Sequence, residues 1–152
     1  MTHKEYQHII CAVRGGPESR ATVTRAIDLS LADNARLTFL HVMDAEFLQY
    51  ATVGPLSVIY SELVEMGKFT MLILCDRAQR RGVSQVDYIV REGSVRKQLL
   101  RFAVETQADL LVVGSPTRSP GSNVFKPNEL PAFVTELAQA GDIQVIQVTP
   151  ED

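Results

Sequence analysis

Short apolar runs alternate with stretches of helical periodicity along this chain, and this alternation constrains its fold more than any other feature. The apolar runs are residues 8–13, 36–43, 83–93, 109–115 and 143–149, and the helical stretches are 19–33, about 58–82, 94–107 and about 128–140. Strands that alternate with helices form a parallel sheet covered on both faces. The sequence therefore predicts an α/β fold, a doubly wound five-stranded parallel sheet in a single domain that spans residues 1–152.

Several residues indicate where these elements begin and end. Ser19 and Ser94 stand at the start of helical stretches and can accept a hydrogen bond from a free N–H of the first turn. Gly141 suits a left-handed residue at the end of the last helix. In the run 83–93 apolar and polar residues alternate, which predicts a strand with one less buried face.

The long helical stretch raises a question about what covers it. Its apolar residues at helical spacing are Ile59, Leu63, Met66 and Ile73. The segment 69–75, which begins at Phe69 and ends at Cys75, is apolar around most of its circumference, so a helix on one sheet face would expose part of it. Two explanations stay open: a groove covered by the preceding loop, or contact with a protein partner.

Composition excludes several classes of function. The formal net charge is −3, so the chain has no basic field for nonspecific nucleic-acid binding. Its hydrophobic content of 45% in 152 residues is enough for one core. No apolar window approaches the ~18 residues of a membrane span, and the N-terminus lacks an apolar signal region. We expect a cytoplasmic protein without a nucleic-acid or membrane partner.

The chain offers no catalytic or metal-binding motif. Cys11 and Cys75 fall in an apparent strand and an apparent helix, which predicts small buried hydrophobes rather than a disulfide or a metal pair. The histidines have no carboxylate or cysteine at ligand spacing, so no metal site is expected. The G-x-S-x-G and Walker patterns are absent, and we do not expect an enzyme.

Two glycine-bearing loops follow predicted strand ends. "RGGPES" follows the first strand and "GSPTRSPGSN" follows the fourth. Ligands of doubly wound sheets bind beyond the carboxyl ends of the strands, where the strand order reverses. The second loop has glycines, hydroxyls and Arg118, but its two prolines lack the backbone N–H that a phosphate-binding loop donates.

Residues 90–115, "VREGSVRKQLLRFAVETQADLLVVGS", place a strand, Glu-Gly, a helix, Ala-Asp, a strand and Gly-Ser in succession. Together with "RGGPES", "LHV" and the last strand "QVIQV", this succession resembles the universal stress protein (UspA-like) family over nearly the whole chain. The resemblance implies the strand order 3-2-1-4-5. Both glycine loops would then border one cleft between the first and fourth strands.

Nucleotide-binding members of that family carry G-x2-G-x9-G-[S/T] after the fourth strand, and this chain departs from the motif. Gly114 matches the first glycine, whereas the second falls on Thr117. Counted forward, the third glycine falls on Pro127; counted back from the last strand, it falls on Pro131. Either count puts proline where the motif has its third glycine, and proline has no N–H to donate.

The first loop departs from the family as well. Arg14 stands where the family usually has an aspartate that contacts the nucleoside, which reverses the local charge. Val42, after His41, matches the position whose backbone meets adenine in nucleotide-binding members, although packing explains a valine in a buried strand equally well.

Two alternatives stay open for these loops. Two arginines could replace the lost donors and hold a phosphate, or both could be solvated while prolines shape the loop. The candidate nucleotide-binding residues are Val13, Arg14, Gly15, Val42, Gly114, Ser115, Arg118, Gly121 and Ser122.

The altered motif favours a noncatalytic regulatory domain of the stress response, with no cofactor and without ordinary ATP binding. The alternative is a nucleotide-binding switch that takes ATP or AMP through Arg14 and Arg118. Because the resemblance implies pairing of last strands, we expect a homodimer through residues 143–149, which begin at Ile143 and end at Thr149. Two glutamines interrupt this apolar run, as expected of an edge strand.

Overall fold

The described residues form the strands and helices in the predicted order. The structure, a computed structural model, describes residues 5–13, 19–44, 55–114 and 129–148. Its strands are β1 (His8–Ala12), β2 (Arg36–Asp44), β3 (Val86–Gly93), β4 (Leu110–Gly114) and β5 (Gln144–Val148). Its helices are α1 (Ser19–Asp33), α3 (Pro55–Arg81), α4 (Val95–Glu105) and α5 (Glu129–Gly141).

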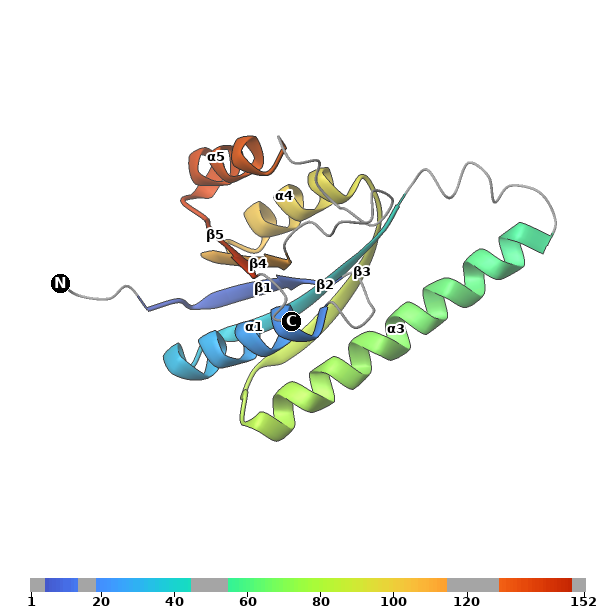
Figure 1. Ribbon diagram of the computed structural model, residues 1–152, viewed down its shortest axis with the longest axis horizontal. Helices are drawn as coiled ribbons and strands as arrows, with labels where there is room; N and C mark the ends of the chain where they lie inside the picture. Colours follow the sequence, from blue (N-terminus) through green and yellow to red (C-terminus); the bar gives the residue numbers. More distant parts are fainter. Residues whose placement is uncertain (1–4, 14–18, 45–54, 115–128, 149–152) are drawn as a thin grey trace.

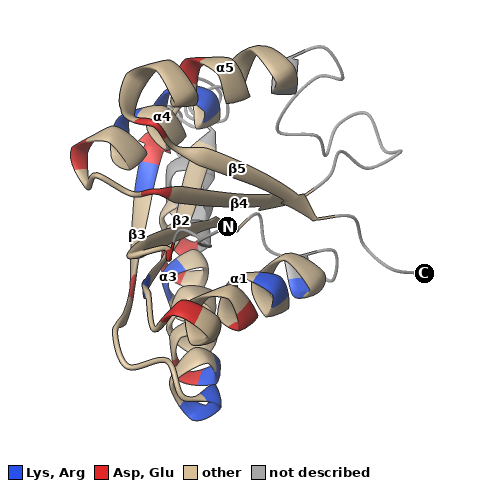
Figure 2. Ribbon diagram, turned by 90° about the vertical axis from the view of Figure 1, so that its left-hand side faces the viewer, with Lys and Arg blue, Asp and Glu red and all other residues tan. Residues whose placement is uncertain are grey.

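The strands form one parallel sheet in the order β3-β2-β1-β4-β5. The order reverses between β1 and β4. Helices α1 and α3 lie side by side on one face, and α4 and α5 cover the other (Figure 1 and Figure 2). The predicted fold class and strand order are therefore confirmed.

The central strands are buried on both faces, which explains their continuous apolar runs. Successive side chains of a strand point to opposite faces, so Ile9 of β1 packs with α1 and α3 while Ile10 packs with α4 and α5. Leu110 and Leu111 of β4 divide in the same way, and all four side chains are inaccessible to solvent. Coverage by helices on both faces explains the unbroken apolar runs of β1 after His8 and of β4.

All four described helices end at a left-handed residue followed by a buried apolar one. The left-handed residues are Asn34, Gly82, Gln107 and Asp142, and the buried residues after them are Ala35, Val83, Ala108 and Ile143. The prediction that Gly141 takes the left-handed conformation is wrong, because α5 continues through it and Asp142 has a φ of 56°. Aspartate tolerates this region, and its N–H bonds to the Ala138 carbonyl at 3.1 Å.

The third strand begins later than predicted, at Val86 instead of Val83. Gly82 has a φ of 111°, which lets its N–H and that of Val83 bond to the carbonyls of Gln79 and Ala78, each at 3.0 Å. These two bonds satisfy carbonyls in the last turn of α3. Val83 is therefore apolar because it packs at the end of this helix, and not because it begins the strand. Every residue of β3 is at least partly exposed, rather than those of one face only, because β3 is an edge strand.

The predicted serine caps are only partly confirmed. Ser94 precedes α4 with an extended backbone, but its side chain makes no capping hydrogen bond. Ser19 is the first residue of α1 rather than the residue before the helix. For α1 and α4 the sequence therefore locates the start of the helix to within a residue, without establishing the capping bond, whereas α3 begins three residues earlier than the predicted 58.

Helix α3 faces the core with other residues than its apolar spacing indicated. The buried side chains are Met71, Cys75 and Ala78, and the exposed ones include Met66, Phe69, Leu72 and Ile73. The loop that could cover the exposed side, residues 45–54, lies outside the described residues.

No helix in the described ranges, α3 included, is both long and apolar enough to cross a membrane.

We predict that Gly93→Ala lowers the free energy of unfolding by about 1–2 kcal/mol, because Gly93 ends β3 with a φ of 136°, where side chains are strained. The added Cβ would also lie 3.1 Å from Nε2 of Gln98, a contact that the flexible side chain can relieve. Urea unfolding followed by circular dichroism measures the loss.

Gly141→Ala is the matched control. Gly141 lies in α5 without a left-handed φ, and its Cβ would contact Ile143 at an ordinary 3.4 Å. An equal loss of stability in both variants would contradict the role of backbone strain at Gly93.

Candidate functional site

Val13, Val42 and Gly114 are the candidate residues that the structure describes, and they lie toward the same edge of the sheet. Val13 directly follows β1, Val42 lies near the carboxyl end of β2, and Gly114 ends β4. Since β1 pairs with both β2 and β4, all three occupy neighbouring strands around the switch point. The remaining candidates, Arg14, Gly15, Ser115, Arg118, Gly121 and Ser122, lie outside the described residues.

Strand β2 holds both backbone polar groups of Val13. The N–H of Val13 donates to the Leu40 carbonyl at 2.9 Å. The imidazole of His41 lies 2.8 Å from the Val13 carbonyl through Nδ1, which must carry the proton because a carbonyl only accepts. Helix α3 backs this histidine closely, since a Cβ on Gly67 would lie 3.3 Å from its Cδ2. The end of β1 is therefore fixed, and its backbone offers no vacant donor at Val13.

Gly114 has a packing role that is independent of any ligand. A Cβ at this position would lie 3.2 Å from Oγ1 of Thr22, which is tighter than ordinary contact. Thr22 is a buried residue of α1, with 2% of its surface exposed. The close approach of α1 to the end of β4 therefore explains a glycine here without a nucleotide.

The helix after the fourth-strand loop begins at Glu129, and its third residue is Pro131. Proline is tolerated there because the N–H groups of a helix's first turn have no partner within the helix. The Pro131 carbonyl accepts a hydrogen bond from Oγ1 of Thr135 at 3.1 Å. The third glycine of the family motif aligns with Pro127 or with Pro131, depending on the direction of counting. Pro131 lies in the first turn of α5, and Pro127 lies outside the described residues.

Both cysteines are free and buried, as predicted. Burial raises the pKa of Cys11 to about 12. Burial, and then the charge of Asp87, raise the pKa of Cys75 to about 11. Both thiols stay protonated at neutral pH, so neither supplies a thiolate nucleophile.

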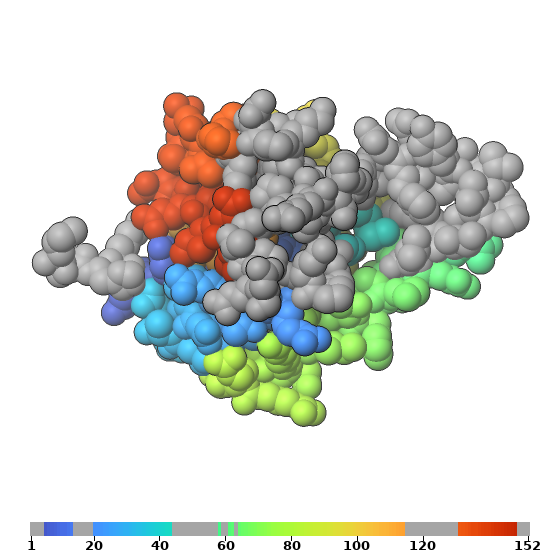
Figure 3. Space-filling model, viewed as in Figure 1, coloured from blue at the N-terminus to red at the C-terminus, as the bar shows by residue number. Residues whose placement is uncertain are grey.

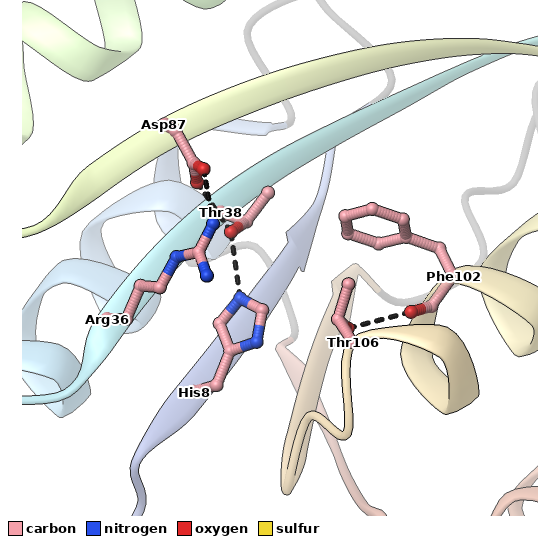
Figure 4. A network of polar contacts seen from close by, with 6 residues as sticks. All are labelled: His8, Arg36, Thr38, Asp87, Phe102 and Thr106. Carbon is pink, nitrogen blue, oxygen red and sulfur yellow. Dashed lines mark hydrogen bonds and ion pairs between the residues drawn. The ribbon is translucent and has the colours of Figure 1, made fainter.

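A polar network lies at the opposite edge of the sheet, near the amino ends of β1, β2 and β3 (Figure 4). The Thr38 hydroxyl donates to Oδ1 of Asp87 at 2.6 Å, and the Arg36 guanidinium pairs with Oδ2 at 2.6 Å. Nε2 of His8 lies 2.8 Å from the same hydroxyl, which can only accept because its proton is already engaged. His8 therefore carries a proton on Nε2. The network joins three strands, far from the candidate cleft.

Sequence reasoning missed the structural role of Asp109. Its two carboxylate oxygens accept from the backbone N–H groups of Gln7 and His8, at 2.8 and 3.0 Å. Its backbone N–H donates to the His8 carbonyl, and its carbonyl accepts from the N–H of Gln144. An aspartate directly before an apolar run was the available signal, because such a carboxylate can collect unpaired N–H groups.

A family model described as the universal stress protein family matches residues 5–128. No curated protein matches the chain significantly.

Solved structures share its fold. The universal stress protein UspA from Lactobacillus plantarum is 19% identical, with 96% of this chain and 99% of that chain covered and a TM-score of 0.74. A universal stress protein in complex with cAMP is 23% identical, with 97% and 100% covered and a TM-score of 0.63. A universal stress protein from Archaeoglobus fulgidus in complex with dAMP is 12% identical, with 95% and 99% covered and a TM-score of 0.59.

The packing role of Gly114 predicts energetic coupling to Thr22. We expect Gly114→Ala to lower the free energy of unfolding by about 1 kcal/mol, and to cost less when Thr22→Ala removes the opposing oxygen. Thermal unfolding of the two single variants and the double variant measures the coupling. Strictly additive losses would show that the two residues do not press on each other.

Burial lowers the pKa of His8, and the neighbouring Arg36 lowers it further, while Thr106, Asp87 and Asp109 oppose these shifts less strongly. In acid the unfolded chain therefore binds a proton at His8 that the folded chain does not. We predict that stability falls as the pH drops from about 7.5 to about 5.5, and that His8→Gln falls less over this range. Urea unfolding at both pH values measures this; an unchanged difference in the variant would contradict it.

Proposed function

This chain belongs to the universal stress protein family, and we propose that it is a noncatalytic cytoplasmic regulatory domain of the stress response that acts as a homodimer without ordinary ATP binding. The proposal rests on the first turn of α5, the helix that follows the loop after β4. Free N–H groups at the start of such a helix are what hold a phosphate.

The first turn of α5 is poorly suited to an anion. Pro131, its third residue, has no N–H to donate. The first turn therefore has one donor fewer to offer a phosphate than a helix start without proline.

The other described candidates add little to a nucleotide site. Both backbone groups of Val13 are engaged by β2, and Gly114 is explained by the approach of Thr22. Val42 packs against the core on the side of α4 and α5, so it too has a structural role. Each residue that matches the family's site in the described residues therefore has a reason to be there without a ligand.

A nucleotide-binding switch is the second candidate function. It is favoured by the complexes of similar folds with cAMP and dAMP, and by the two arginines that could replace lost backbone donors. In that case Arg14 and Arg118 would bind the phosphates, each with a guanidinium that can form two parallel hydrogen bonds.

Calorimetric titration with ATP, ADP and AMP separates the two functions. We predict no saturable heat at about millimolar nucleotide, the limit of weak binding. A one-to-one isotherm that Arg118→Ala abolishes would establish the switch and overturn the proposal. Lys97→Ala, which changes an exposed cation on α4, is the matched control for charge.

The proposed dimer forms through β5, an edge strand whose Gln144 and Gln147 are exposed as predicted. The N–H of Gln144 points toward β4, where it donates to the Asp109 carbonyl at 3.1 Å. In a strand, the backbone N–H groups of successive residues point to opposite sides. Gln147 is three residues after Gln144, so its N–H points away from β4 and is available to a second strand.

We predict that Gln147→Pro reduces association through this edge without removing a bond to β4, because proline lacks only the outward N–H. Gln147→Thr keeps that N–H and is the matched control. Light scattering after size-exclusion chromatography measures the mass of each variant. An unchanged mass for Gln147→Pro would contradict pairing through β5.

A further inference from the structure

Large apolar side chains lie exposed along one side of α3. Met66, Phe69, Leu72 and Ile73 expose 63, 65, 52 and 53% of their surfaces. Apolar residues scattered singly over a surface need no explanation, but these four gather within two turns of one helix. They form an apolar patch that is exposed to water unless another surface packs against it.

The patch faces directly away from the sheet. Met71 is buried. Phe69 lies two residues before it in the sequence, and Ile73 lies two residues after it. Two residues correspond to about 200° around an α-helix, so both side chains emerge opposite the buried one. Helix α3 lies at the periphery of the molecule beside α1, as the space-filling view shows (Figure 3). The patch is therefore not part of the core that the described residues form.

Three of the four, Met66, Phe69 and Ile73, belong to a longer row of exposed residues along α3. We name it the outer stripe, and its members are Glu62, Met66, Phe69, Ile73, Asp76 and Arg80, all exposed. Their spacing of four and three residues in turn is that of the contact positions of two helices packed as a coiled coil. The outer stripe spans about 27 Å of helix, at about 1.5 Å per residue.

We propose that the outer stripe packs against the outer stripe of a second copy of this chain, with the two α3 helices antiparallel about a two-fold axis at the level of Met71. In this arrangement Phe69 lies across from Ile73 of the second copy, and the reverse contact repeats it. Glu62 lies across from Arg80 of the second copy at both ends. The contact is isologous, which is the geometry of most homodimers.

Charge complementarity selects a second copy as the occupant. The outer stripe is acidic at its first residue, apolar in the middle and basic at its last, so it is complementary to itself only when reversed. A parallel pair would place Glu62 against Glu62 and Arg80 against Arg80. Asp76, which falls across from Met66, already has a partner in Arg80 of its own helix at 3.0 Å. Acidic groups along the stripe also make an anionic lipid surface a poor occupant.

This contact does not depend on the proposed strand-edge dimer. Helix α3 packs on β2 and β3, whereas β5 is the edge strand at the other end of the sheet. The two surfaces can be occupied together, which would produce assemblies larger than a dimer. The variant Gln147→Pro isolates the helix contact from the strand contact.

The test measures self-association of the full chain carrying Gln147→Pro by sedimentation velocity, up to about 100 µM. We expect a dimer, and Phe69→Glu in the same background should weaken it by at least about tenfold, because a charge enters the apolar centre. Val104→Glu, at a 40% exposed apolar residue of α4, is the matched control and should leave the dimer intact. A Gln147→Pro chain that is monomeric at all concentrations would overturn the helix contact, and would support the strand contact if the unsubstituted chain associates.

Charge reversal tests the antiparallel register and keeps the proposal falsifiable if Phe69→Glu misfolds. Glu62→Arg alone and Arg80→Glu alone should each associate more weakly, because like charges then face each other. An equimolar mixture of the two variants should associate as well as the parent, because every pair across the interface regains opposite charges. A mixture no stronger than its components, or a monomer that instead binds phosphatidylserine vesicles, would overturn the proposal.

Discussion

The pairing of β1 with β4 joins the two halves of the sheet, and the rest of the structure depends on it. The strand order reverses at this junction. Because β1 and β4 are not consecutive in the chain, no short loop holds them together. Asp109 secures the amino end of the pair, where its carboxylate accepts two N–H groups of the chain entering β1. Its backbone N–H and carbonyl bond to His8 and Gln144, so Asp109 ties the chain entering β1 to the starts of β4 and β5. The opposite end of the same pair is where the candidate cleft begins.

Different side-chain interactions occur at the amino ends and at the carboxyl ends of the strands. At the amino edge, His8, Thr38 and Asp87 form hydrogen bonds that connect three strands. At the carboxyl ends of the strands, His41 bonds to the Val13 carbonyl after β1 and Thr22 packs against Gly114 of β4. A fold of this kind retains its shape when the binding chemistry changes, because the sheet is held by burial and by groups away from the cleft.

Periodicity predicted the order of the elements, because burial on two faces demands unbroken apolar strands and burial on one face demands a helical stripe. It failed where a local rule and packing compete. Gly82 was a readable helix terminator, but Asn34, Gln107 and Asp142 adopt the same conformation because the buried residue after each one fixes the chain. The core side of α3 could not be predicted, because its segment 69–75 is apolar around most of the helix and carries no periodic signal of orientation. For the site, sequence predicted which strand ends meet, whereas the packing role of Gly114 requires the position of Thr22.

The carboxyl ends of the strands keep the family's fold, and we propose that the phosphate-binding chemistry there has been replaced. The most direct measurement follows the amide resonances of Val13, Val42 and Gly114 by ¹⁵N NMR while ATP is added, with inorganic phosphate as a parallel titration. These residues lie on the three neighbouring strands that end at the cleft. We expect their amide shifts to stay unchanged up to about millimolar ATP. Saturable shifts of all three with ATP, and not with phosphate, would contradict it.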